Sequence, residues 1–319
     1  MKKKFLLKKN EINLRLDYFL KTKFSSYKRN FFQNLIKKKN VFVNKIYKKK
    51  NYLLKNNDVI EIFVKKKKFH YQKMKIHLLY EDEYILIINK KSGLVVHPGN
   101  GNKSMTLSNG LHFYFKKIMN DNYPFLGHRI DKGTSGLILV SKYEKILNKI
   151  SKQFWFNKIK RKYITLVWGI FFKKEGTIIC NLGRCLKNKT HMNVFPNGCL
   201  GKQAITHYKV LETFKYFSLL KCSLETGRTH QIRVHLKYIG HPIFNDKNYG
   251  EDKKYKNFLS FKERIFLEKC LKLKTLKYQA LHAYYLEFKH PIYLKNKYLI
   301  SPIPEKFKFL LKKIKNFCL

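Results

Sequence analysis

One carboxylate in the chain stands in a setting suited to chemistry. Asp131 lies in the polar, glycine-containing segment His128–Gly136, which leads directly into the apolar run Leu137–Val140. A short polar loop before a buried strand can hold an acidic side chain at the mouth of a cleft, where it can react. Taken by itself, the same residue could instead cap the backbone amides of Thr134 and Ser135.

A second polar segment further along the chain is cationic where the first is acidic. The segment Leu224–Leu236 contains Arg228 and Arg233. The chain has only eight arginines among its 69 Lys and Arg residues, so an arginine marks a place where lysine does not serve. Only arginine offers a planar fork to a carboxylate or phosphate, or stacks flat on a base. The two arginines are therefore candidates for contacts with an acidic group or with RNA.

These two segments, together with Arg161–Gly169, resemble the signature motifs of the RluA-type pseudouridine synthases, which isomerise uridine within RNA. The resemblance implies that Asp131 is the catalytic aspartate and that the reaction uses no metal and no other cofactor. It also implies that Arg228 pairs with this aspartate and keeps it ionised, because a neighbouring guanidinium lowers the pKa of a carboxyl group. Arg233, five residues on and on a different helical face, would then contact the backbone or order the site.

Two more substrate-binding residues follow from the same resemblance. Tyr163 matches the active-site tyrosine of the family, whose ring stacks on the extruded base and favours it by about 1–3 kcal/mol. A strand tyrosine packed in the core is the alternative. Arg129 matches an arginine that enters the RNA helix where the flipped base was. Gly133 departs from the family pattern, which usually has Asp or Glu there, and we expect activity to survive with looser loop packing.

Other reaction classes fit the residues poorly. The sequence has no glycine-rich phosphate loop, no dinucleotide fingerprint and no zinc-type spacing among its six cysteines, so neither a nucleotide nor a metal is expected. His128, Asp131 and Ser135 are the residue types of a serine hydrolase. Eight consecutive residues hardly converge as a triad, however, and the sequence contains no G-x-S-x-G elbow.

The composition points to a polyanionic partner. The chain has 69 Lys and Arg against 20 Asp and Glu, a formal charge of +49, which favours RNA or DNA over a neutral substrate. Lys, Asn, Ile, Phe and Tyr are all overused, as in very A+T-rich genomes, and this accounts for part of the charge. No apolar stretch is long enough for a signal peptide or a membrane span. We therefore expect a soluble, cytoplasmic protein with reduced cysteines.

The order of polar and apolar segments predicts an α+β fold with two domains. The expected parts are a small basic domain at residues 13–64, a basic linker at 65–75, a catalytic domain with a largely antiparallel sheet at 76–305, and a C-terminal helix at 306–319 packed on it. The motif order in the first domain resembles the S4 RNA-binding domain, which implies that Arg15 and Arg29 contact RNA. A small basic domain without an RNA role is the alternative.

Further segments narrow the resemblance to the D-type branch of the family, which modifies large-subunit ribosomal RNA at a stem-loop near the decoding site. They are Gly93–Gly101, Lys189–Val194, Ala204–Tyr208 and Leu281–Ala283. The expected partner is large-subunit ribosomal RNA or the precursor 50S particle, with no membrane, no obligatory protein partner and a monomeric state. The alternatives are the C-type branch, which modifies other large-subunit uridines, and an RNA-binding or assembly protein whose synthase activity has decayed.

Overall fold

The computed structural model divides into two compact units, residues 1–69 and residues 70–319. It describes residues 2–24, 29–63, 71–99, 101–119, 124–250 apart from 187, 189, 197 and 199, and 260–318 apart from 263, 266, 267 and 269–275. Residues 65–70 of the expected linker lie outside these ranges. No helix within them has both the length and the apolar character needed to cross a membrane.

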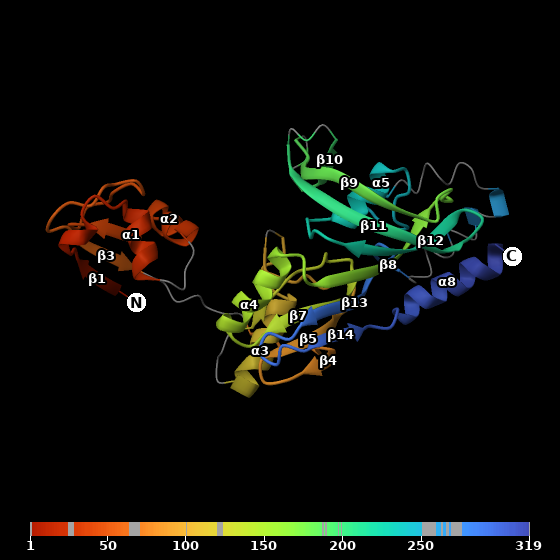
Figure 1. The fold of residues 1–319 in the computed structure, drawn as a ribbon, viewed down its shortest axis with the longest axis horizontal. Coiled ribbons are helices and arrows are strands. Elements are labelled where there is room, and N and C mark those ends of the chain that lie inside the picture. The colour runs from red at the N-terminus through yellow and green to blue at the C-terminus, as the bar shows by residue number, and fades with distance from the viewer. Residues whose placement is uncertain are drawn as a thin grey trace. The chain divides into compact units, whose positions relative to one another are not determined.

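The N-terminal unit packs two helices on a three-stranded sheet of order β1-β3-β2 (Figure 1). Its elements are β1 (Lys2–Leu6), the 3-10 helix η1 (Lys9–Glu11), α1 (Leu16–Lys23), α2 (Arg29–Lys37), β2 (Val41–Val43) and β3 (Val59–Phe63). The apolar positions of the two helices recur at helical spacing, so each helix turns one face into a common core that contains Leu16, Phe19, Leu20, Phe32 and Ile36. The unit starts earlier than residue 13, because β1 pairs with β3 in antiparallel register.

The second unit is built on one large sheet, in the order β10-β9-β11-β12-β8-β13-β7-β5-β4, with β14 beside β13 and β6 beside β7 (Figure 1). The pairings are antiparallel, apart from the parallel pairing of β13 with β7. This sheet confirms the predicted α+β class. The strands are β4 (Leu78–Glu81), β5 (Ile85–Lys90), β6 (Phe125–Leu126), β7 (Ser135–Ser141), β8 (Lys160–Trp168), β9 (Glu175–Arg184), β10 (Met192–Phe195), β11 (Lys202–Thr213), β12 (Phe217–Leu224), β13 (Leu281–Lys289) and β14 (Asn296–Ile300).

The helices that accompany this sheet include α3 (Leu107–Met119), α4 (Glu144–Trp155), α5 (Gln231–Tyr238) and α8 (Glu305–Cys318). Helix α4 contacts β6 and β7, whereas α5 contacts β10 and β11. Helix α8, where a C-terminal helix was expected, buries Phe307, Leu310 and Ile314 in the main core. Helix α5 is buried over most of its length, from Gln231 to Leu236, so any charged side chain on it needs a partner within the protein.

Three adjacent strands in the middle of the sheet bring distant segments into one row. Gly136 on β7 is opposite Ala283 on β13, and Ala283 is opposite Tyr163 on β8. Gly136 has a φ of +115°, and a Cβ there would overlap the carbonyl oxygen of Ala283, so only glycine permits this close approach. The register therefore places Tyr163 two strands away from the end of the loop that carries Asp131.

Candidate active site

A buried lysine at the end of β5 anchors the loop that carries Asp131. Lys90, the last residue of β5, is 2% exposed, and its Nζ donates to the carbonyl oxygens of Lys91, Leu94 and Lys132. Burial lowers the pKa of Lys90 to about 7, and the charge of Asp131 opposes this shift. Since three carbonyl acceptors favour the ammonium form, Lys90 ties the residue after Asp131 to the loop that follows β5.

The same loop is closely packed at Gly133. This glycine is buried, and a Cβ there would overlap Oε1 of Gln279. The amide of Gln279 also donates to the hydroxyl of Thr134. The prediction of looser packing at Gly133 is therefore wrong, because Gln279 occupies the space beside it.

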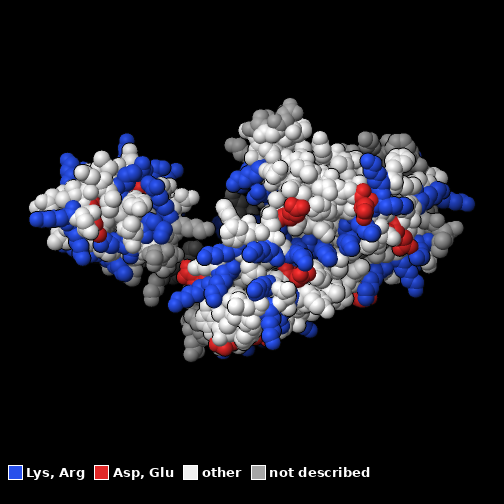
Figure 2. All heavy atoms as spheres, viewed as in Figure 1, with Lys and Arg blue, Asp and Glu red and all other residues white. Residues whose placement is uncertain are grey.

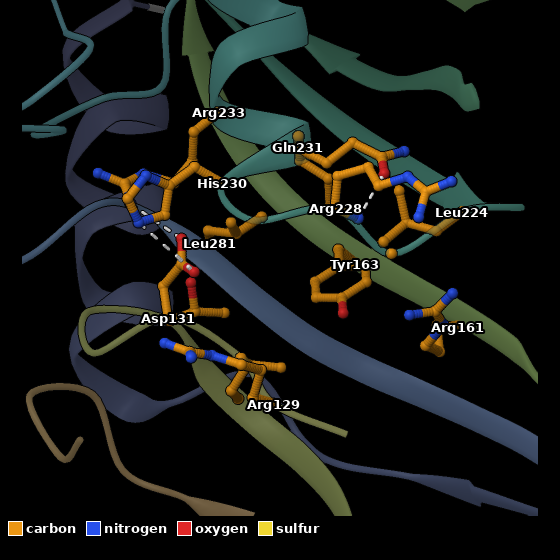
Figure 3. Close-up of a pocket in the computed structure, with 14 residues that line it drawn as sticks. Arg129, Asp131, Arg161, Tyr163, Leu224, Arg228, His230, Gln231, Arg233 and Leu281 are labelled. Atoms are coloured by element: carbon orange, nitrogen blue, oxygen red, sulfur yellow. Dashed lines mark hydrogen bonds and ion pairs between the residues drawn. The ribbon is translucent and has the colours of Figure 1, made fainter. Parts of the chain in front are cut away.

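Arg233, not Arg228, pairs with Asp131. Its Nη1 donates to Oδ2 of Asp131 at 2.8 Å, and its side chain is 7% exposed. Figure 3 shows the carboxylate of Asp131 turned toward Arg233 and His230, while Arg228 extends away from it. The exposed Arg228 instead donates from Nε to the carbonyl oxygen of Gln203 on β11.

The predicted pairing of Arg228 failed for a local reason. Arg228 and Arg233 do not lie on the same helix, because α5 begins only at Gln231. The side chain of Gln231 turns back, accepts from the amide of Arg228 and donates to the carbonyl oxygen of Ile205. These bonds fix the preceding loop against β11 and point Arg228 outward. A sequence signal was present, since an arginine between Ile232 and Val234 on a buried helix requires an acidic partner.

A second carboxylate holds Arg233 from its other side. Asp246 has a fully buried side chain, and its two oxygens accept from Nε and Nη2 of Arg233 at 2.6 and 2.8 Å. Burial acts to lower the pKa of Arg233, but the hydrogen bonds and charges of Asp246 and Asp131 outweigh burial and raise it. Arg233 therefore stays charged between two carboxylates. Sequence reasoning missed Asp246, which lies in a turn without a motif of its own.

Two more residues that the sequence analysis did not assign border the carboxylate. Nε2 of His230 lies 3.9 Å from Oδ1 of Asp131, and Nδ1 of His230 lies 2.7 Å from the hydroxyl of Tyr249. The ring of Tyr249 also covers the guanidinium of Arg233, whose Cζ lies 4.8 Å from the ring centre. Asp131 is thus flanked by one cation and one imidazole, both of which contact Tyr249.

Tyr163 lines the same pocket as Asp131, Arg129, Arg228 and His230. It is 6% exposed, and burial raises the pKa of its hydroxyl, so the phenol stays neutral. Its neighbour Arg161 also lines the pocket. The buried Nε of Arg161 has no hydrogen-bond partner among the described residues, and Arg161 is a further cation that sequence reasoning did not assign.

The other predicted site residues lie at exposed or structural positions. Arg129 is exposed at the edge of the pocket, on the other side of Asp131 from Arg233 (Figure 3). Arg15 and Arg29 both bond to the buried Asp17, with Nε–Oδ distances of 3.3 and 3.0 Å. Their side chains remain 45% and 42% exposed, so each guanidinium has a structural partner and an open side.

The ionisable groups around Asp131 are arranged for acid–base or nucleophilic chemistry. Within the described ranges, no group of three or more His, Cys, Asp or Glu side chains is placed to hold a metal ion. The pocket instead combines the carboxylate of Asp131, the ring of Tyr163 and four arginines, of which Arg233 is one. That combination suits a polyanionic substrate with a planar group, such as RNA with an unstacked base.

Comparisons with known proteins identify the family of the chain. The family described as RNA pseudouridylate synthase matches residues 84–238. An uncharacterized RNA pseudouridine synthase of Chlorobaculum parvum is 36% identical over 312 residues, which are 95% of this chain and 94% of that protein. The ribosomal large subunit pseudouridine synthase D of Pasteurella multocida is 34% identical over 314 residues, 96% of this chain and 93% of that protein.

The solved structures show the same fold. The structure of human RNA Pseudouridylate Synthase Domain Containing 4 is similar with a TM-score of 0.60 and 23% identity, covering 75% of this chain and 93% of that one. Human RNA Pseudouridylate Synthase Domain Containing 1 gives a TM-score of 0.54 at 22% identity, over 75% of this chain and 86% of that one. From the extent of its curated relatives, the chain belongs to the RluA-type RNA pseudouridine synthases and is an isomerase that acts on RNA.

Proposed function

We propose that this enzyme converts uridine to pseudouridine in large-subunit ribosomal RNA, in the stem-loop near the decoding site, and that it does so in the cytoplasm. Relatives that match 94% and 96% of the chain are named ribosomal large subunit pseudouridine synthase D. The observation that carries the chemical part of the proposal is the pairing of Asp131 with Arg233 in the pocket that Tyr163 also lines. An ionised carboxylate beside an aromatic ring is what this isomerisation needs.

The reaction sets the requirements for the site. The bond between C1′ of the ribose and N1 of uracil breaks, the base turns, and a new bond joins C1′ to C5. The proton on C5 leaves and N1 gains a proton, so no electrons are exchanged with a cofactor. The base must first leave its stack, which costs a few kcal/mol and costs less in a loop than in a paired stem.

In this proposal each pocket residue has one task. Asp131 supplies the carboxylate oxygen at the sugar or base, and Arg233 holds the carboxylate in place through its 2.8 Å ion pair. Tyr163 stacks on the turned base, while Arg129 enters the RNA at the position that the base has left. Arg228 contacts RNA at the edge of the pocket, since its side chain is exposed and faces away from Asp131.

The N-terminal unit is proposed to be an S4-like domain that contributes affinity and site choice. Figure 2 shows Lys and Arg side chains over the visible faces of both units. Arg15 and Arg29 are held by Asp17 in fixed directions and keep an open side, which suits contacts with RNA phosphates. Neither residue belongs to the motifs that form the Asp131 pocket, so no chemical step is assigned to them.

The experiment that tests the proposed function maps the product. The protein is incubated with precursor large subunits that lack the modification, and every new pseudouridine is located. Modification of the stem-loop near the decoding site is the expected result, with Asp131→Asn as the inactive control. Modification at other large-subunit uridines would favour the C-type alternative. Binding without any pseudouridine would identify the decayed alternative.

A further inference from the structure

The hydroxyl of Tyr249 fixes which nitrogen of His230 carries the proton. The backbone amide of Met192 on β10 donates to this hydroxyl at 2.8 Å, and Nδ1 of His230 lies 2.7 Å from it. In the part of the chain that the structure describes, the hydroxyl has no third hydrogen-bond partner. Its single hydrogen is satisfied only if it is donated to Nδ1. The imidazole is then neutral, and its proton lies on Nε2.

The tautomer matters because Nε2 faces the catalytic carboxylate. Oδ2 of Asp131 accepts from Arg233, whereas Oδ1 lies 3.9 Å from Nε2 of His230. Oδ1 is therefore the carboxylate oxygen that Arg233 leaves available for reaction. His230 has a φ of +55° immediately before α5, so its direction is set by a strained turn as well as by Tyr249. Backbone strain of this kind persists where the surroundings enforce it.

We propose that His230, held by Tyr249 as the neutral Nε2–H tautomer, orients Oδ1 of Asp131 for attack, and that Tyr249 is a positioning residue acting through His230. The proposal rests on the proposed catalytic role of Asp131. Arg233 binds one oxygen tightly, and His230 presents a neutral donor to the other. A protonated His230 would pair with Oδ1 and withdraw it from reaction. The 3.9 Å separation is longer than a hydrogen bond, so the proposal requires that it shorten when substrate binds, as contacts of catalytic groups often do.

The surroundings of His230 favour the neutral form. Burial lowers its pKa, and the charge of Asp131 acts in the opposite direction. Of the other charged groups, Arg233 and Arg129 lower the pKa and Asp246 raises it. Lys132 and Lys247 line a second cavity, which Asp131 and His230 also border. Donation from Tyr249 also stabilises the neutral imidazole, because a protonated Nδ1 cannot accept that hydrogen.

The first test is Tyr249→Phe, which removes only the hydroxyl and keeps the ring over Arg233. The substrate is precursor large subunits labelled with [5-³H]uridine, and tritium release is followed as a function of pH. We expect kcat to fall about tenfold, the equivalent of one lost hydrogen bond, while KM stays unchanged. Without its donor the neutral imidazole is less favoured, so the pKa of His230 rises and the acid limb of the rate profile moves to higher pH.

A second test asks whether Tyr249 acts through His230. In His230→Gln, the side-chain amide places an N–H donor near the position of Nε2, and this amide has no alternative tautomer. In His230→Met, the side chain has a similar length but offers no hydrogen-bond donor. Both replacements have an unbranched Cβ and meet the same left-handed backbone. We expect the Gln variant to lose less activity than the Met variant. Tyr249→Phe should have no further effect in the Gln background, where the tautomer no longer matters.

The outcomes separate this inference from the proposed function. An active Asp131→Asn variant would overturn the role of Asp131 itself. An inactive Asp131→Asn variant together with a wild-type rate and pH profile for Tyr249→Phe would overturn only the inference. An equal loss for Tyr249→Phe in the wild-type and His230→Gln backgrounds would do the same. Nitrogen NMR of histidine-labelled wild-type protein decides independently of any variant, since an Nδ1–H tautomer at His230 contradicts the proposal.

Discussion

Replacing Arg233 by lysine tests the central electrostatic feature of the site. The guanidinium uses three nitrogens to bind two carboxylates: Nη1 on Asp131 at 2.8 Å, and Nε and Nη2 on Asp246 at 2.6 and 2.8 Å. The substituted lysine keeps the positive charge but offers a single nitrogen, which cannot reproduce this fork. The change therefore isolates geometry from charge.

The size of the effect follows from the contacts that are lost. A hydrogen bond that involves a charged group contributes about 1.5–3 kcal/mol. If the contact with Asp131 is the one lost, kcat should fall about 10- to 150-fold, at about 1.36 kcal/mol for each factor of ten. Loss of the contacts with the fully buried Asp246 should also lower the free energy of unfolding by at least ~2 kcal/mol, since breaking a buried ion pair typically costs ~3–5 kcal/mol.

The assay is single-turnover tritium release, combined with urea denaturation, and the matched control is Arg228→Lys. Arg228 is exposed, and within the described residues its side chain donates one hydrogen bond, to the carbonyl oxygen of Gln203. Its replacement should raise KM through a weaker RNA contact and leave kcat near the wild-type value. A large loss of kcat in Arg228→Lys with near-normal kcat in Arg233→Lys would refute the assignment and restore Arg228 as the partner of Asp131.

Three further predictions concern the carboxylate and the N-terminal unit. Asp131→Asn should abolish tritium release while RNA affinity, measured by filter binding, stays nearly intact; substantial turnover would exclude Asp131 as the reactive group. Deletion of residues 1–70 should weaken RNA binding and flatten the slope of log affinity against log salt, because fewer phosphate contacts release fewer counterions; an unchanged slope would mean that the unit does not touch RNA. Burial acts to raise the pKa of Asp17, but hydrogen bonds from Arg29, Gln33 and Arg15 outweigh burial and lower the pKa from 3.8 to about 2. Because the folded pKa lies below the unfolded one, about 2 kcal/mol of stability is present above pH ~4 and lost as the pH falls through ~2. Hydrogen exchange in α1 and α2 should show this loss, and an Asp17→Asn variant with wild-type protection at pH 6 would contradict it.

Much of the protein can be read from contiguous stretches of sequence. The apolar run after the Asp131 loop forms β7, which is buried at every position, and the terminal apolar spacing forms α8. The family could be identified because its motifs are continuous and keep the order and residue types that the chemistry requires. Asp131 and Tyr163 lie together in one pocket. This is because β7, which follows Asp131, and β8, which carries Tyr163, are both neighbours of β13 in the sheet.

The partner of Asp131 could not be read in this way. Arg228 and Arg233 belong to the same motif, and their spacing alone does not say where the helix starts or which guanidinium turns inward. That choice depends on Gln231 binding back to β11, on α5 packing against β10 and β11, and on a turn that brings in Asp246 and Tyr249. The sequence by itself determined the reaction class and singled out Asp131 as the candidate reactive carboxylate, since both reside in local motifs. Only the tertiary structure decided how that carboxylate is held, because a buried charge must find its opposite charge in space, wherever along the chain that partner lies.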